Sequence, residues 1–243
     1  MVNSENFSIL KRLVEQWNAV RSEIRRMHQG VQIRPDDINS LLRPIDGTDP
    51  NVAYFQLHPV VFNLPERATY ADTDLFVVIE GLLSYRRPEF REDKRLLTDS
   101  FATHAAYFRR TRDALLHVFG VHYDYSRDDI GHPAFHGQMK SFVDFGELVK
   151  QEYRLDLQVQ DSIKGVLNRV RVPTAQMDVF SVFLQMCADH LLHNGSSTDE
   201  VSAFSALLAK SHFCIGAAFQ LPRLGTDEAR TCYRARHWYP ATT

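Results

Sequence analysis

Four runs rich in β-branched and aromatic residues occupy the middle of the chain and constrain its fold more than any other feature. They cover residues 53–62, 73–85, 97–109 and 115–125. Prolines and clusters of charged residues separate the runs, and this spacing is typical of strands joined in an antiparallel meander. A further short strand is expected at 134–141. The sequence therefore predicts an antiparallel sheet over about residues 53–141.

Helical patterns flank this sheet on both sides. Apolar residues recur at helical spacing over 5–28 and predict an N-terminal helix that begins near Ser4. Helices are also expected in a C-terminal part that covers about 173–212. Between the first helix and the sheet, a turn-rich connection predicts a short helix at 36–42, and the charged stretch 86–95 is expected to be a solvated turn.

Composition agrees with one folded domain. The chain has 243 residues, of which 44% are hydrophobic and 24% charged, as in ordinary globular proteins. Helix, sheet and helices in this order indicate a single α+β domain over 1–243, with helices packed on one face of the sheet.

With 28 Lys and Arg against 30 Asp and Glu, the formal net charge is −2. A global basic field for nucleic acid or anionic membrane is therefore absent, although a local basic patch is compatible with this charge.

The cysteines and the hydropathy pattern bear on the compartment. The three cysteines are odd in number and form no CxxC pair, so no disulfide framework or Cys-based zinc site is expected. The N-terminus has no apolar run of signal-peptide length, and no stretch resembles a membrane span. We expect a cytoplasmic protein with no membrane partner.

One predicted hairpin carries a cluster of polar side chains, in the segment HYDYSRDDIGHPAFHGQ. Side chains alternate between the faces of a strand, so His122 and Asp124 share one face of the strand that holds them. In the returning strand, His136, Gln138 and Lys140 share a face. Matching the apolar faces of the two strands places both polar sets on the same side, where cross-strand neighbours lie about 5 Å apart.

Two chemistries suit this cluster. Two neutral imidazoles and one carboxylate are suitable ligands for a divalent transition metal. Alternatively, His122 and His136 act as general base and general acid, since an unperturbed imidazole titrates near pH 6.5. That is the chemistry of metal-free RNA cleavage. Asp124 would then orient one imidazole, and Gln138 and Lys140 would contact the phosphate.

Three arginines, and three histidines on the predicted strands, lie outside this cluster. Arg109, Arg110 and Arg112 lie between two predicted strands, and we expect them to form a phosphate-binding edge beside the histidine cluster. The histidines at 58, 104 and 117 are interpreted as structural. The cluster itself also has a structural alternative, in which its histidines only form hydrogen bonds across the sheet. No Walker A, GxGxxG, HExxH or GxSxG pattern occurs in usable context.

Two short segments carry a resemblance. HPAFHGQ, at 132–138, follows a predicted strand, and RVPTAQMDVF, at 171–180, opens a predicted helix. This pairing of His-Pro-x-x-His with Arg-x-Pro-Thr resembles uncharacterised bacterial domain-of-unknown-function proteins of the toxin–antitoxin and defence-island type. The resemblance covers about residues 100–190 and implies a bacterial accessory or defence-type protein, without an established activity.

Two classes of function follow. The first is a non-enzymatic interaction or accessory protein of such a system, which binds a protein partner or self-associates. Its surface would come from the apolar helices at 5–28 and 174–194 and from an aromatic tail with Tyr233, Trp238 and Tyr239. The alternative is a toxin-like ribonuclease that uses the His122/His136 cluster, with RNA as its partner and either acid–base or metal-assisted chemistry.

Overall fold

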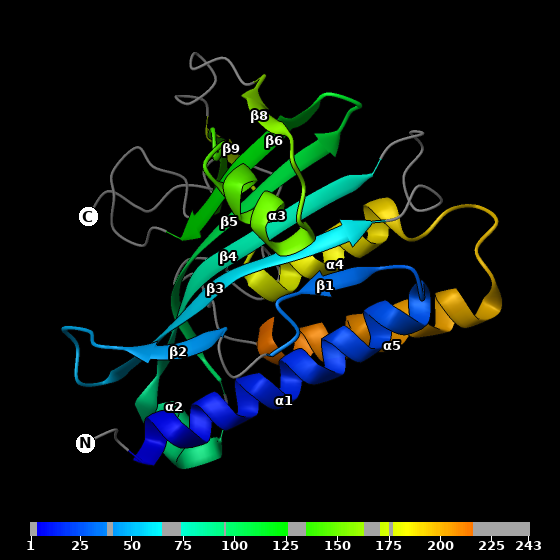
Figure 1. The fold of residues 1–243 in the computed structure, drawn as a ribbon. Coiled ribbons are helices and arrows are strands. Elements are labelled where there is room, and N and C mark those ends of the chain that lie inside the picture. Colours follow the sequence, from blue (N-terminus) through cyan, green and yellow to red (C-terminus); the bar gives the residue numbers. More distant parts are fainter. Residues whose placement is uncertain are drawn as a thin grey trace.

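A long, twisted antiparallel sheet forms the body of the molecule (Figure 1). The computed structural model describes residues 4–37, 41–64, 74–94, 96–125, 135–162, 171–174 and 177–215. Four long strands form the centre of the sheet: β3 (Val52–Leu64), β4 (Leu75–Arg86), β5 (Thr98–Arg110) and β6 (Ala114–Tyr125). Each pairs with the next in antiparallel register. Together with the helices described below, this arrangement confirms the predicted α+β class.

Shorter strands extend the sheet at both edges. The free edge of β3 pairs with β1 (Gln32–Arg34) and β2 (Leu42–Ile45), both antiparallel. At the other edge, β6 pairs antiparallel with β7 (Phe135–Met139) and parallel with β8 (Gln158–Asp161). The last strand, β9 (Arg171–Pro173), pairs with β7, so that the main order is β1-β3-β4-β5-β6-β7-β9.

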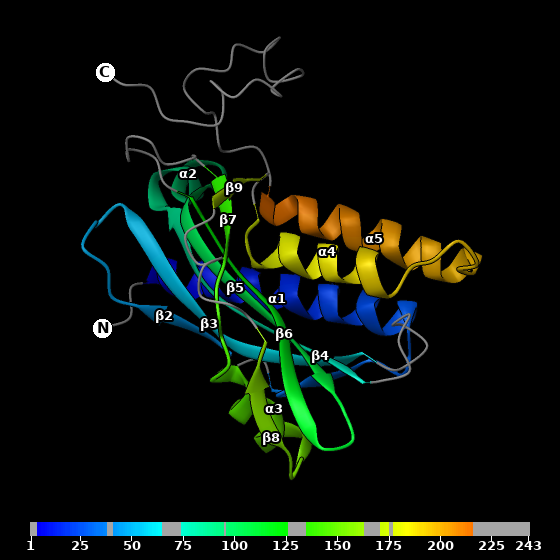
Figure 2. The same ribbon diagram turned by 90° about the horizontal axis from the view of Figure 1, so that it is seen from above.

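The helices divide unequally between the two faces of the sheet. Three of them, α1 (Ser4–Met27), α4 (Val179–His190) and α5 (Thr198–Ile215), lie on one face, which we call the inner face (Figure 2). A single helix, α3 (Phe145–Tyr153), lies on the opposite, outer face together with β8. The short α2 (Arg87–Asp93) connects β4 to β5. No helix in the described part of the chain is long and apolar enough to cross a membrane.

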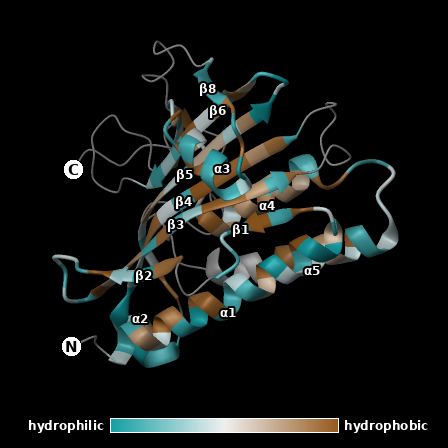
Figure 3. Ribbon diagram, viewed as in Figure 1, coloured by the Kyte–Doolittle hydropathy of each residue, from teal (hydrophilic) through white to brown (hydrophobic). Residues whose placement is uncertain are grey.

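The main hydrophobic core lies between the inner face and its three helices. Along α1, apolar and polar residues alternate at helical spacing (Figure 3), and the apolar stripe from Ile9 to Met27 is buried. Trp17 is buried at the centre, with ring centroids 6.4 Å from Phe62 on β3 and 4.8 Å from Phe183 on α4. These contacts bury the apolar surface that the helical periodicity of residues 5–28 had predicted.

A smaller core on the outer face lies under α3. Phe76, Phe108 and Leu115 from three neighbouring strands pack there with Val149 of α3. The hydroxyl of Tyr153 donates to backbone carbonyl oxygens of β1 and β3, which fixes the end of the helix. This core covers only one part of the outer face. Further along β4, β5, β6 and β7, the same face carries polar side chains.

The predicted elements agree with the structure at the centre and differ at the periphery. The N-terminal helix and the four long strands begin and end within about two residues of their predicted positions. The short helix at 36–42 is wrong for the part that is described, because Leu42 begins β2 and pairs with Leu57 of β3. The charged stretch 86–95 holds α2, whose first turn contains Pro88. Proline is favoured there because the first turn needs no backbone N–H donor.

Candidate functional site

A row of carboxylates and imidazoles crosses the outer face. Strand register aligns Glu80 of β4 with His104 of β5, and His104 with His122 of β6. Asp124 lies two residues beyond His122 on the same face and is aligned with His136 of β7. We call these five residues, from four adjacent strands, the histidine row.

Each accessible imidazole in the row has its own carboxylate partner. Glu80 Oε1 lies 2.9 Å from His104 Nδ1, and Asp124 Oδ2 lies 2.8 Å from His122 Nε2. The two rings lie next to each other, with centroids 4.9 Å apart and planes tilted by 38°. The other carboxylate oxygen of Asp124 lies 2.7 Å from His136 Nδ1. Asp124 thus links two imidazoles whose ring centroids are 6.2 Å apart.

Exposure separates the members of the row. The side chains of His104 and His122 are 25% and 22% exposed, whereas that of His136 is 1% exposed. Among the described residues, Nε2 of His104 has no hydrogen-bond partner. Nδ1 of His122 is buried and also lacks a partner there. A ligand on the outer face can therefore reach His104 and the edge of His122, but not His136.

The structure brings together the polar residues that the alternation argument grouped. His122, Asp124, His136 and Gln138 lie on one face of the β6–β7 hairpin, and Gln138 is aligned with His122. Within the described residues, no group of three or more His, Cys, Asp and Glu side chains is arranged to hold a metal ion. His122 Nε2 and His136 Nδ1 each lie beside an oxygen of the Asp124 carboxylate.

Two further side chains border the row on the side of α3. The Phe142 ring lies 4.9 Å from the His104 ring, centroid to centroid. The Lys140 ammonium lies 5.4 Å from the centroid of Phe142, so Phe142 is in contact range of both Lys140 and His104. Lys140 is exposed, as a group that contacts an anionic ligand must be.

The arginines expected beside the cluster lie elsewhere. Arg109 and Arg110 end β5, and Arg112 lies in the turn to β6. Six residues of strand separate His104 from Arg110, which corresponds to about 20 Å. Arg110 lies 3.3 Å from a carboxylate oxygen of Asp74. The expectation that these arginines flank the histidines is wrong, because they lie at the far end of the β5–β6 hairpin.

Sequence reasoning missed Glu80 and His104 as members of the row. His104 was interpreted as structural, and Glu80 was not considered. A signal was present, since Glu80 and His104 are polar residues within predicted strands that are otherwise largely apolar. Aligning them with His122 requires the register of three strands, which one hairpin does not provide. His132 and Pro133 of the predicted motif lie outside the described residues.

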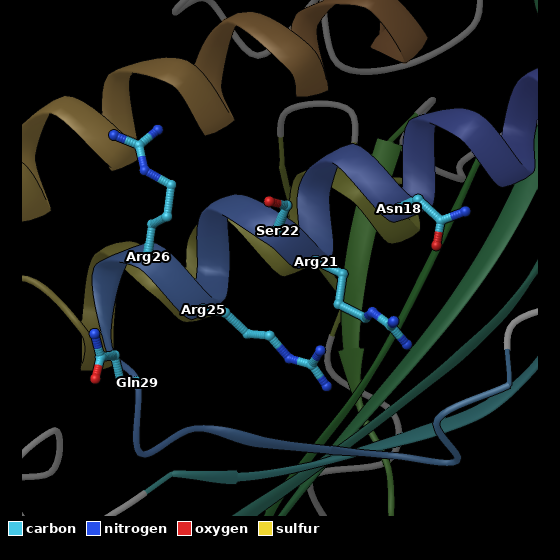
Figure 4. A pocket seen from close by; sticks show the side chains of 6 residues that line it. All are labelled: Asn18, Arg21, Ser22, Arg25, Arg26 and Gln29. Atoms are coloured by element: carbon cyan, nitrogen blue, oxygen red, sulfur yellow. The ribbon is translucent and has the colours of Figure 1, made fainter.

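A second polar surface lies on α1. A shallow depression of about 510 Å³ is lined by Asn18, Arg21, Ser22, Arg25, Arg26 and Gln29 (Figure 4). Arg26 reaches toward α5 and lies 2.6 Å from Glu23, whereas Arg21 and Arg25 point toward β1 and contact Asp36. Basic residues near the end of a helix also complement its dipole. These arginines are not part of the histidine row, because α1 lies on the inner face of the sheet and the row lies on the outer face.

The inner face holds a separate group of titratable side chains near the end of α4. The ring of Tyr107 lies 5.7 Å from that of His190. Burial raises the pKa of Tyr107 and of Tyr123, and it lowers the pKa of His190 against the opposing effect of Asp189. All of these shifts favour the neutral form, as expected for polar groups that pack against a core.

Comparison with known proteins adds no relative. No protein-family model, curated protein or solved structure matches the chain. The fold and the site by themselves define an α+β protein whose open antiparallel sheet carries a row of three histidines and two carboxylates on its outer face.

Proposed function

We propose that the histidine row is an acid–base catalytic site that cleaves RNA, with His104 and His122 as the proton-transferring pair. The observation that carries this proposal is the pair itself: two partly exposed imidazoles 4.9 Å apart, each beside its own carboxylate. Catalytic histidines commonly have such a carboxylate, which fixes the ring and stabilises its charged form.

His104 is suited to act as the general base. When its Nδ1–H donates to Glu80, its Nε2 holds the lone pair, and no described residue occupies that atom. Nε2 then takes the proton of a ribose 2′-hydroxyl. The 2′ oxygen forms a bond to phosphorus as the bond from phosphorus to the 5′ oxygen breaks.

His122 is suited to act as the general acid. Its Nε2 lies 2.8 Å from Asp124 Oδ2, and the proton on Nε2 passes to the departing 5′ oxygen when that oxygen replaces the carboxylate as its hydrogen-bond acceptor. The products are a 2′,3′-cyclic phosphate and a 5′-hydroxyl, and water later returns both imidazoles to their starting states. Lys140 and Gln138 would contact the phosphate oxygens, where a cation stabilises the negative charge that develops.

His136 receives a different role from the one that its sequence position suggested. Because its side chain is 1% exposed, it does not touch a substrate on the outer face. Its Nδ1 lies 2.7 Å from the second oxygen of Asp124, the carboxylate that also lies beside His122. We therefore propose His136 as a positioning residue and not as half of the catalytic pair.

The test is cleavage of a single-stranded RNA oligonucleotide in EDTA by wild type and by His104→Ala and His122→Ala. Proton transfer by one positioned side chain contributes about 10²- to 10⁴-fold, so each variant should lose at least about 10²-fold in rate. His58→Ala is the matched control, since it removes a histidine from β3, outside the row. Wild-type protein that leaves the RNA intact, or His104→Ala that cleaves at the wild-type rate, refutes the proposal.

The rival function is a non-enzymatic interaction or accessory protein of the defence type that the resemblance implies. The apolar stripes of α1 and α4 that would supply its surface are buried in the core, and the aromatic tail lies outside the described residues. An exposed apolar pair favours this function at a different place: Val172 on β9 is 55% exposed, and Met139 on the neighbouring strand β7 is 39% exposed. Intact RNA in the assay above favours this rival. For both functions we propose a cytoplasmic setting, from the odd cysteine count.

A further inference from the structure

A second histidine–carboxylate pair joins β6 to β8. His117 of β6 is fully buried, and its Nδ1 lies 2.9 Å from Asp161 Oδ1 on β8. Its Nε2 is buried without a partner among the described residues. Burying an imidazole costs free energy unless its nitrogens are hydrogen-bonded, and Asp161 satisfies one of the two ring nitrogens of His117. The proposed RNA cleavage does not use this pair.

The same carboxylate joins the two ends of the segment 140–162, which we call the arm. The hydroxyl of Ser141, at the start of the arm, donates to Asp161 Oδ2 near its end. The arm thus leaves β7, forms α3 and β8, and returns to its starting point. We call His117, Asp161 and Ser141 the clasp, because they join both ends of the arm to the sheet.

The start of the arm is held against the row. The backbone N–H of Lys140 donates to the carbonyl oxygen of Gly120 at 3.0 Å. Gly120 is required there, since a Cβ would overlap the Lys140 carbonyl oxygen and lie 3.0 Å from both His117 Nε2 and the Phe142 ring. The next residues bring the Phe142 ring to 4.9 Å from the ring of His104.

We infer that the clasp positions the catalytic site, because it fixes the start of the arm and with it Phe142 against His104 and Lys140 against Phe142. The inference rests on the proposed function for its catalytic consequence, whereas the placement of Phe142 against His104 stands on the contacts alone. Ser141 connects the clasp to the site, because its hydroxyl donates to Asp161 and its neighbours in the chain are Lys140 and Phe142.

The test compares Ser141→Ala with Ser162→Ala. The Ser162 hydroxyl also donates to β6, at the His117 carbonyl oxygen 2.6 Å away, but it does not join the two ends of the arm. Each variant loses one hydroxyl on the same edge of the sheet. The first measurement is the NMR chemical shifts of the His104 ring protons, which the Phe142 ring influences. We expect Ser141→Ala to move them and Ser162→Ala to leave them at wild-type values.

The second measurement is RNA cleavage in a double-mutant cycle with Lys140→Ala. Misplacing a catalytic group by about 1 Å can cost about 10²-fold, so Ser141→Ala should lower kcat by up to that factor with little change in KM. The same substitution should cost less once Lys140 is alanine, because only its effect through Phe142 then remains. Additive losses overturn the inference while leaving the ribonuclease proposal intact. Unchanged His104 resonances in Ser141→Ala overturn it even if the wild type does not cleave RNA.

Discussion

Substituting Gly120 with alanine tests the packing of the arm against β6. The added Cβ would overlap the backbone carbonyl oxygen of Lys140, and it would lie 3.0 Å from His117 Nε2 and from a ring carbon of Phe142. The closest of these atoms belongs to backbone that is tied to Gly120 by a hydrogen bond. It cannot rotate away as the end of a flexible side chain could, so the whole start of the arm must move.

The cost can be worked from these contacts. Forcing an extra carbon into a packed site costs about 1–3 kcal/mol, and the lost hydrogen bond between Lys140 and Gly120 adds about 1 kcal/mol. We therefore expect Gly120→Ala to lower the free energy of unfolding by about 2–4 kcal/mol in urea denaturation. Gly195→Ala is the control, because its Cβ would meet only His193 at 3.4 Å, and it should cost less than about 1 kcal/mol. Equal stability of Gly120→Ala and wild type would refute the packing described for the arm.

Three other predictions concern stability. Trp17→Ala removes a ring buried between the sheet and α4. It should lower the free energy of unfolding, measured by urea denaturation, by about 3–5 kcal/mol. A decrease of less than about 1 kcal/mol would contradict the placement of Trp17 in the core. Asp178 accepts hydrogen bonds from the backbone N–H groups of Phe180 and Ser181 at the start of α4. Asp178→Ala should therefore lower the free energy of unfolding by about 1–2 kcal/mol in urea denaturation. An unchanged midpoint would show that this helix cap contributes nothing. Burial holds the pKa of His190 below its ordinary 6.5, so the unfolded chain binds this proton first as the pH falls. The contribution of His190 to the free energy of unfolding should therefore be flat above about pH 6.5 and decrease below it. His190→Gln should reduce that slope, and an identical pH dependence in wild type and variant would contradict the assignment.

Local pattern was sufficient to predict the hairpin part of the site. Within one strand, alternation alone places His122 and Asp124 on a common face, and the apolar partners Tyr123 and Phe135 fix which face that is. The register of β6 and β7 then aligns Asp124 with His136. These residues are close in sequence, so few alternative pairings compete with the observed one.

The other half of the row depends on a β-bulge that the pattern does not reveal. In the β5–β6 pair, Phe108 is aligned with His117 but Tyr107 is aligned with Phe119, so Val118 is an extra residue. Without this bulge, His104 would be aligned with an apolar residue of the inner face, and a slip of one residue exchanges the two faces. The bulge therefore brings His104 opposite His122.

The peripheral elements were missed because their residues are placed by distant partners. β1, β2, β8 and β9 have three or four residues each, too few to show an alternating pattern. The clasp joins His117 to a carboxylate 44 positions later in the chain. Such pairs depend on the packing of α3 on the outer face, and neither composition nor spacing predicts them.

The chemistry of the cleaved ends tests the central claim most directly. Single-stranded RNA incubated with the wild-type protein in EDTA, and separated by mass, should yield fragments that end in a 2′,3′-cyclic phosphate and begin with a 5′-hydroxyl. An RNA whose riboses are replaced by 2′-deoxyribose should remain intact, because the attacking hydroxyl is absent. RNA that stays uncleaved, or fragments that carry a 5′-phosphate, would contradict proton transfer by His104 and His122 as the function of the row.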